Sequence, residues 1–394
     1  MKILIVGAGI AGPTLAYWLQ RSGHEVTIIE HAPKLRTGGY IVDFWGAGFD
    51  VAEKMGIVPE LRRRGYVFTE ARTVDREGRR IASLNPSVIL ESNDRYLSIA
   101  RSELSAVIYE SLRGGVRLIL DDTVRSLDDD GDGVSVTHAS GETAEYDLVV
   151  GADGLHSRVR SLVFGPDREF ERYLGMVVAA FESDHYPKRD ELVAMMHAEV
   201  GFQAVRLSLR DERTLLLFSV RHDGEVAVDR AGQEQLLRAR LSEGGWEVPT
   251  MLEAMAQAQD FYFDSVSQIR MPSWSKGRVA LVGDAAAGPS FLAGQGSALA
   301  MVEAYTLAAE LARSDDHNDA FARYHERLAP LLRSKQDAAK GLGLAFAPKD
   351  RLQLFVRNAV MKLMALPGIS ALAMGKSFYD AVELPPFVDA RTAR

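Results

Sequence analysis

The sequence predicts an α/β protein with three parts: a Rossmann-like nucleotide-binding domain, an inserted domain built on a mixed β-sheet, and C-terminal helices. Two observations predict this class. Short apolar runs, typical of strands buried on both faces, are spread along the chain at 3–6, 146–151 and 278–282, and each enters a glycine-containing turn. The stretches between them, at 66–98 and 170–270, have the patterns of further strands.

The first 30 residues form a strand–helix–strand unit. The apolar run at 3–6 is followed by the glycine motif, and apolar residues recur at helical spacing over 13–21. Ser22-Gly23 ends this helix, and a second strand over 26–29 ends at Glu30. This order is typical of a βαβ unit with parallel strands.

The remaining elements follow from periodicity and turn residues. Further helices are expected at 48–64, 101–112, 233–241, 250–258 and 297–312, and over most of 318–375 with breaks at Pro348 and Pro367. Further strands are expected at 116–120, 134–137, 176–181, 192–196, 202–209 and 214–220. Because strands of the nucleotide-binding type occur at the beginning, middle and end, we expect that domain to be discontinuous: 1–72, 98–169 and 271–335. The inserted domain then comprises 73–97 and 170–270, and 336–394 form a C-terminal helical segment.

Composition excludes several classes of protein. The 394 residues include no cysteine, which excludes disulfides, Cys-ligated metals, a Cys nucleophile and a cysteinyl-linked cofactor. With 46 Lys+Arg against 54 Asp+Glu the net charge is −8, which argues against a nucleic-acid-binding protein. His317 and His325 are eight residues apart and no HExxH occurs, so no metal site is expected.

The sequence shows no secretion or membrane signal. The first apolar run enters the glycine motif at once, which leaves no room for a signal peptide. No apolar stretch reaches the roughly 18 residues that a membrane span needs. We therefore expect a cytoplasmic protein without a membrane span, as a monomer or homodimer.

The first motif is Gly7-x-Gly9-x-x-Gly12, between a strand and a helix. Gly7 permits the tight turn, Gly9 lets a pyrophosphate approach the backbone, and Gly12 lets the helix pack on the strand. The helix N-terminus would face the phosphates. Glu30, at the end of the second strand, is placed to accept hydrogen bonds from a ribose. An acid there favours an adenosine without a 2′-phosphate.

Two further motifs follow buried strands. Asp153-Gly154 forms the turn after 148–151, before a short helix. Asp284 follows the strand at 278–282, where an open α/β sheet binds ligands. A glycine cluster, Gly294-Gln295-Gly296, then opens a long helix, which is an anion-receptive position.

In this order and spacing, the three motifs resemble the group A flavoprotein aromatic hydroxylases of the para-hydroxybenzoate hydroxylase fold. The resemblance covers the whole chain and implies non-covalent FAD. Gly7 to Glu30 would hold the ADP part, Asp284 the ribityl chain, and the backbone N–H groups of Gly294–Gly296 the N1/O2 edge of the flavin. The cofactor residues that it implies are Gly7, Gly9, Gly12, Glu30, Arg36, Asp43, Arg101, Asp153, Gly154, Asp284, Pro289, Gly294, Gln295 and Gly296.

The sequence departs from that family pattern at two positions. Ala298 stands where many relatives have Asn, and Glu303 stands at a position that is usually Asp. Because backbone donors can hold the flavin, we interpret both as differences between subgroups.

The resemblance also implies a reaction. NADPH or NADH, bound transiently, would reduce FAD; O₂ would form a C4a-hydroperoxyflavin, and its distal oxygen would pass to an aromatic small molecule. The C-terminal helices and the helix after Gly296 are similar to those of tetracycline-inactivating and polyketide-tailoring monooxygenases. The substrate would then be a polycyclic aromatic or polyketide-like molecule, including tetracycline-type antibiotics.

Three alternatives stay open. The first is a flavin-dependent reductase or dehydrogenase of the same fold, without oxygen insertion. The second is a flavin-carrying binding or regulatory protein without turnover. A plain NAD-dependent dehydrogenase is the weakest, because Asp284 and Gly294–Gly296 would have no role.

In this fold the substrate pocket lies between the flavin and the inserted sheet. No catalytic side chain is assigned; the candidates are Arg206, His197 and His222, of which the two histidines are possible bases. The candidates for substrate contact are aromatic, cationic or flexible apolar residues: Phe44, Trp45, Arg206, Phe218, Arg221, Phe291 and Met374.

Overall fold

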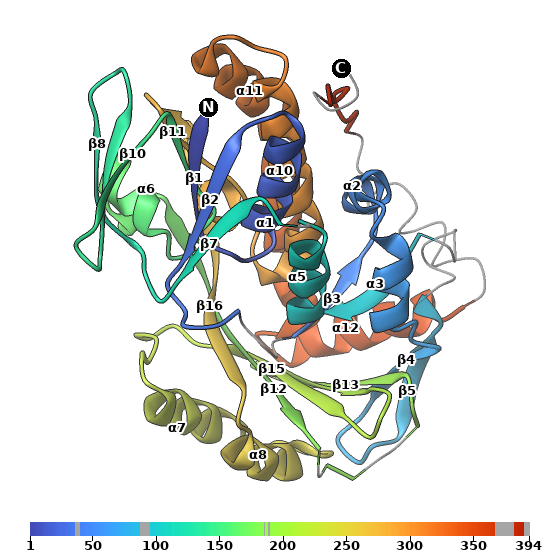
Figure 1. Ribbon diagram of the computed structural model, residues 1–394. Helices are drawn as coiled ribbons and strands as arrows, with labels where there is room; N and C mark the ends of the chain where they lie inside the picture. The colour runs from blue at the N-terminus through green and yellow to red at the C-terminus, as the bar shows by residue number, and fades with distance from the viewer. Residues whose placement is uncertain are drawn as a thin grey trace.

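The computed structural model describes residues 1–35, 40–86, 95–112, 114–184, 186–187, 190–366 and 382–389. Two large sheets organise the chain (Figure 1). The first has the order β17-β18-β11-β1-β2-β7, and all its neighbouring strands are parallel except β17 with β18. Its strands are Ser275–Lys276, Val279–Leu281, Leu148–Gly151, Lys2–Val6, Glu25–Glu30 and Val116–Leu120 in that order.

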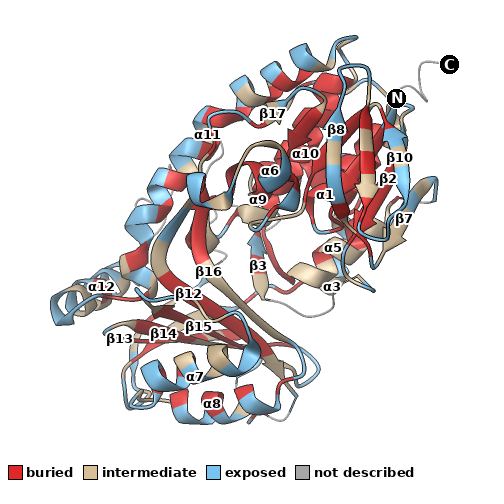
Figure 2. Cartoon of the chain, turned by 90° about the vertical axis from the view of Figure 1, so that its left-hand side faces the viewer, coloured by how far each residue is buried: buried red, intermediate tan, exposed pale blue. Residues whose placement is uncertain are grey.

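The apolar strands of this sheet are buried because helices cover them. α1 (Ala11–Arg21) packs beside α10 (Gly296–Leu311), whose side chains are buried on almost every side (Figures 1 and 2). A helix that is apolar all round belongs in a core. α2 (Ala47–Met55) packs on α10, and α5 (Arg101–Glu110) packs on α1 and on α3 (Val58–Arg64).

Smaller elements surround this sheet. A three-stranded antiparallel sheet has the order β10-β9-β8, and β3 pairs with β6 as a two-stranded ribbon. Two short helices, α6 and α9, follow β11 and β18. The bounds of these smaller strands and helices are Thr143–Tyr146 for β10, Val134–His138 for β9, Val124–Asp129 for β8, Ile41–Phe44 for β3, Leu97–Ala100 for β6, Arg158–Val163 for α6 and Asp284–Ala287 for α9.

The second large sheet is mixed, with the order β16-β12-β15-β14-β13-β4-β5. Only β4 and β13 are parallel neighbours. Its strands, in that order, are Phe261–Ile269, Glu171–Ser183, Thr214–Arg221, Phe202–Ser208, Val193–Glu199, Glu70–Val74 and Arg80–Leu84. Together the two sheets confirm the predicted α/β class with a Rossmann-like sheet and a mixed sheet.

The two faces of the mixed sheet have different neighbours. Val177, Ala179 and Phe181 join the core formed with α7 (Arg230–Leu241) and α8 (Val248–Gln257). Alternate residues, among them Met176 and Val178, pack toward the loop η2 (Phe291–Ala293) and α11. The second face is therefore covered by η2 and α11, and Figure 2 shows buried residues along β12, β14 and β15.

Two long helices close the fold. α11 (His317–Phe346) packs on α10 at one end and on η2 further along, and α12 (Arg351–Met364) follows the break at Pro348. Pro330 lies inside α11 without ending it. The boundary that we predicted between 335 and 336 therefore falls within a continuous helix, while the wider division into domains stays a prediction.

Some elements differ from the sequence expectation. The single helix expected at 48–64 is two helices, because Gly56 ends α2 in a left-handed conformation with φ of 73°. The structure adds β3, β8 and β16, which periodicity did not show. Within the described ranges, no helix has both the length and the apolar character to cross a membrane.

A buried carboxyl group holds α10 against the first sheet. Glu303 Oε2 accepts hydrogen bonds from Gly283 N at 2.9 Å and from the Tyr324 hydroxyl at 3.2 Å. Burial raises the pKa of Glu303 to about 8. Glu303, which stands where the family pattern usually has Asp, thus fixes the backbone just before Asp284.

We predict that Glu303 makes stability fall as pH rises. Its folded pKa of about 8 exceeds the ordinary 4.5, so its contribution is lost as the pH rises toward 8. Between pH 6 and 8 this amounts to about 2–3 kcal/mol. The melting temperature of Glu303→Gln relative to wild type should therefore increase between pH 6 and 8.5. Glu253→Gln, on the exposed face of α8, is the control. Parallel pH profiles for wild type and Glu303→Gln would contradict this.

Candidate functional site

The glycine turn after β1 is shaped by close backbone packing. Gly7 N donates to Ile29 O at 2.7 Å, and Gly7 has a φ of 110°. A Cβ on Gly7 would lie 2.5 Å from Ala152 O, and one on Gly12 would lie 2.0 Å from Gly7 O. A Cβ on Gly9 would meet no atom within 4 Å. Gly7 and Gly12 are thus needed for packing, whereas Gly9 leaves room for a ligand.

Glu30 connects the second strand to this turn. Its buried carboxylate accepts hydrogen bonds from Ala8 N at 2.8 Å and from Ala32 N at 3.0 Å. A carboxylate has about four acceptor positions, so it retains capacity for a ribose hydroxyl. Glu30 therefore both fixes the turn and remains able to bind a nucleotide.

The Asp153-Gly154 turn stabilises the start of α6. The Asp153 carboxylate accepts from Ser157 Oγ at 2.5 Å and from Val159 N at 3.1 Å, and burial raises its pKa. The fully buried Arg160 then donates to Ala285 O at 3.1 Å. This motif thereby connects the loop after β11 to α9, which begins with Asp284.

The third motif combines open backbone with unpartnered polar atoms. Gly294 is left-handed, with φ of 66°, and a Cβ there would meet nothing within 4 Å. Among the described residues, Gln295 Nε2 and Ser290 Oγ are buried without a hydrogen-bond partner. Burial raises the pKa of Asp284, and Arg101 and Arg160 oppose that rise. Unpartnered buried polar atoms beside open backbone fit a polar ligand at this place.

Arg101 begins α5 and lies against an aromatic cluster. Arg101 N donates to Tyr40 O at 3.1 Å, and its guanidinium lies 5.9 Å from the Tyr40 ring centre. The Tyr40 ring centre lies 5.1 Å from the Tyr262 ring centre and 5.7 Å from the Phe291 ring centre. The ring centres of Phe291 and Phe346 are 5.6 Å apart. Burial raises the pKa of both Tyr40 and Tyr262. We call these four rings the aromatic cluster.

A polar relay connects the aromatic cluster to solvent. The Tyr262 hydroxyl donates to Asp264 Oδ2 at 3.4 Å, and Asp264 Oδ1 lies 3.0 Å from His156 Nε2. The hydrogen bond to Asp264 raises the pKa of the exposed His156. Sequence patterns do not single out Tyr40, Tyr262, Asp264 and Phe346 as site residues. The alternation in the segment 261–269, if read as a strand, would have placed Tyr262 and Asp264 on one face.

The predicted site residues after Tyr40 make contacts outside the aromatic cluster. Asp43 on β3 accepts from the Tyr96 hydroxyl at 2.8 Å and from Ser98 Oγ at 2.5 Å. Phe44 is fully buried in the core beside Phe49; its contact with substrate stays a prediction. Trp45 lies 5.8 Å from the Lys335 ammonium. Arg36 and Met374, which we predicted from the resemblance, lie outside the described residues.

Three predicted substrate or catalytic candidates lie on the face of the mixed sheet that packs against α7 and α8, not on the face toward η2. Arg206 is buried and pairs with Glu247 at 2.9 Å, next to α8. Phe218 belongs to the core formed with α7 and α8, and His197 contacts Glu199 at 3.0 Å and Trp246. The sheet is buried on both faces, so its sequence did not show which face each residue takes. These three residues do not line the site.

Arg221, Phe291 and Pro289 do lie on the cofactor side. Arg221 pairs across strands with Met176, which faces η2. Pro289 O accepts from Gln268 Nε2 at 3.1 Å. His222 is turned away, with its Nε2 2.9 Å from Glu225 O.

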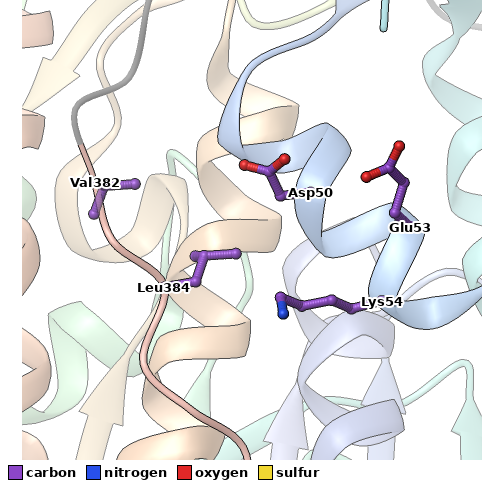
Figure 3. A pocket seen from close by; sticks show the side chains of 5 residues that line it. All are labelled: Asp50, Glu53, Lys54, Val382 and Leu384. Atoms are coloured by element: carbon purple, nitrogen blue, oxygen red, sulfur yellow. The ribbon is translucent and has the colours of Figure 1, made fainter.

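A cavity of about 310 Å³ lies elsewhere, between α2 and the segment 382–384 (Figure 3). Asp50, Glu53, Lys54, Val382 and Leu384 line it, and the Arg95 guanidinium pairs with the Glu53 carboxylate at 2.7 Å. It includes none of the predicted site residues. In the described part of the chain, no His, Cys, Asp or Glu cluster could hold a metal ion.

Comparison with known proteins agrees with this geometry. The family profile described as an FAD binding domain matches residues 1–334. A flavin-dependent monooxygenase from an unknown prokaryotic organism is 34% identical over 391 residues, covering 98% of this chain and 99% of that protein. This chain belongs to the FAD-dependent monooxygenases. The enzyme therefore binds FAD, and its substrate is a small molecule.

Other relatives and solved structures extend the match over the whole chain. A flavin-dependent monooxygenase from Legionella longbeachae is 32% identical over 98% of both chains. The crystal structure of the tetracycline destructase Tet(55) is similar to the enzyme with a TM-score of 0.84, at 32% identity over 98% of each chain. The match includes α11 and α12, beyond the FAD binding domain.

The described residues fit FAD. Gly9 and Gly294 leave backbone open, and Gln295 and Ser290 carry buried polar atoms without a partner among the described residues. We propose that Glu30 and the Gly7–Gly12 turn hold the adenosine and phosphates, and that Asp284 and Gly294–Gly296 hold the flavin end.

We predict that Gly9→Leu loses FAD and keeps the fold. Its side chain would enter open space, where the ligand must approach the backbone. The purified variant should retain less than about a tenth of the flavin absorbance, with an apoprotein melting temperature close to that of wild-type apoprotein. Gly12→Ala should instead lower that melting temperature, because its Cβ would collide with Gly7 O. Full flavin occupancy in Gly9→Leu would contradict the assignment.

We predict that Asp284→Ala weakens FAD binding at least about tenfold. The substitution removes the carboxylate at the carboxyl edge of β18, next to the Gly294–Gly296 loop. Titration of apoprotein with FAD, followed by flavin fluorescence, measures the effect. Asp337→Ala, which removes an exposed carboxylate on α11, is the matched control. Equal dissociation constants for the two variants would remove Asp284 from the site.

Proposed function

We propose that the enzyme uses NAD(P)H and O₂ to insert one oxygen atom into a polycyclic aromatic or polyketide-like small molecule, including tetracycline-type compounds. The balance is one substrate, one O₂, one NAD(P)H and one proton to oxygenated product, NAD(P)⁺ and water. The observation that carries this proposal is the aromatic cluster beside Arg101 and Asp284.

The cluster suits a flat aromatic ligand. Its rings come from four separate segments: the approach to β3, strand β16, the loop η2 and the end of α11. Aromatic rings bury large areas and stack on flat ligands at low entropic cost. Their convergence beside the cofactor residues supports binding of an aromatic substrate there.

Similarity to named enzymes supports the substrate class. The tetracycline destructase Tet(55) shares 32% identity over 98% of each chain, and Tet(51) shares 31%. Tetracyclines consist of fused rings with several oxygen groups. Tetracycline-type compounds are therefore the first substrates to test.

The chain itself would position, shield and move protons. FAD, when bound, would supply the redox chemistry between a nicotinamide, O₂ and the substrate. The N-terminus of the long helix α10 places positive partial charge at Gly296, which would stabilise negative charge on a flavin held there. The Tyr262–Asp264–His156 relay would carry a proton between the buried cluster and solvent.

We predict substrate-stimulated NAD(P)H oxidation with a gain of one oxygen atom. The test screens phenols, polyketides and tetracyclines with the holoenzyme under ¹⁸O₂ and measures product mass. A product heavier by one ¹⁸O atom is expected. Turnover of substrate without oxygen under anaerobic conditions would instead indicate the reductase or dehydrogenase alternative. The cytoplasmic location and the monomeric or homodimeric state stay predictions.

A further inference from the structure

A second cavity, of about 280 Å³, lies where the mixed sheet meets α11 and α12. Leu174, Met176 and Leu292 form its apolar wall. Leu292 belongs to η2, the same loop that carries Phe291 of the aromatic cluster, so the cavity borders the proposed substrate site. This volume is at the low end for ligand pockets. The cavity therefore suits one ring or the end of a larger molecule.

The cavity is lined by cations. Arg221, Lys340 and Lys349 line it, and among the described lining residues there is no Asp or Glu. Lys340 lies 3.5 Å from the Asp337 carboxylate, and Arg270 shares that carboxylate at 2.8 Å. Among the described residues, Arg221 forms no ion pair, and Asp350 is engaged in capping α12. The cavity therefore has an excess of positive charge.

Arg221 is held in a fixed orientation. Its Nε donates to Ala347 O at 2.6 Å, while Arg221 N donates to Gly201 O at 2.8 Å. Burial lowers the pKa of Arg221, and Asp223 offsets that effect only in part. A half-buried guanidinium whose Nε is fixed leaves its terminal N–H groups available to an oxygen anion.

A glycine of α11 keeps the cavity open. Gly343, which lines the cavity, is buried, and a Cβ there would lie 3.8 Å from Arg221 Nη2 and 4.0 Å from Met176 Sδ, in contact with two other lining residues. A larger residue at 343 would fill this space.

We propose that this cavity binds the anionic end, a carboxylate or an enolate, of an aromatic small molecule, with Arg221 as the residue that recognises it. The inference deepens the proposed function, because it treats that molecule as the substrate or product. Arg221 would donate hydrogen bonds to the oxygen anion, and the apolar wall would contact the ring that carries it.

Direct binding to the holoenzyme, without NAD(P)H, tests the inference separately from turnover. The probes are 1-naphthoate and its neutral counterpart 1-naphthamide, titrated by calorimetry. We expect 1-naphthoate to bind at least about tenfold more tightly than the amide. Arg221→Gln should remove that preference and leave amide binding unchanged, because only the anion needs the guanidinium.

Two further variants separate the cavity from general effects. Gly343→Leu should prevent binding of both probes, while the holoenzyme keeps its flavin and its melting temperature. Arg213→Gln, which removes an arginine paired with Glu182 at the other end of β15, should bind both probes as wild type does. Equal affinity for acid and amide, no binding of 1-naphthoate up to 5 mM (on the order of the weakest useful affinity), or unchanged 1-naphthoate binding in Arg221→Gln would each overturn the inference. Oxygen insertion could still be observed in each of these cases, so the two proposals fail independently.

Discussion

The contact between Gly7 and Ala152 sets the geometry on which the site depends. With no Cβ at Gly7, the backbone after β1 approaches the backbone after β11, where a Cβ would come within 2.5 Å of Ala152 O. Gly12 allows the same closeness between α1 and the turn. These contacts bring the carboxyl ends of neighbouring parallel strands to one edge, and the polar residues that follow the strands gather there.

Buried polar groups then hold the loops at that edge. Asp153 caps α6, Arg160 joins α6 to the backbone of α9, and Glu303 holds Gly283 from the side of α10. Each group is buried, and each has partners that satisfy it. A buried group that loses its partners costs free energy, so each loop has one favoured position. Asp284 is thus placed by residues that need not touch the cofactor.

The glycine turns could be predicted from the sequence because their constraints are local. A turn that excludes a Cβ requires glycine at fixed spacing, so Gly7, Gly12 and the motifs after β11 and β18 could be found without coordinates. The aromatic cluster could not, because Tyr40, Tyr262 and Phe346 come from distant segments. Arg206, His197 and Phe218 were misplaced for a related reason: a run such as Thr214–Val220 is apolar on both faces and does not show which side each residue takes.

The alternation of faces in the mixed sheet has a consequence for how such enzymes diversify. Val177, Ala179 and Phe181 pack in the core with α7 and α8, whereas Met176 and Val178 face η2 and α11. Substitutions at every second residue can therefore remodel what the pocket accepts while the layer behind it keeps the sheet folded. One scaffold can in this way acquire new chemistry by changing only half of each strand.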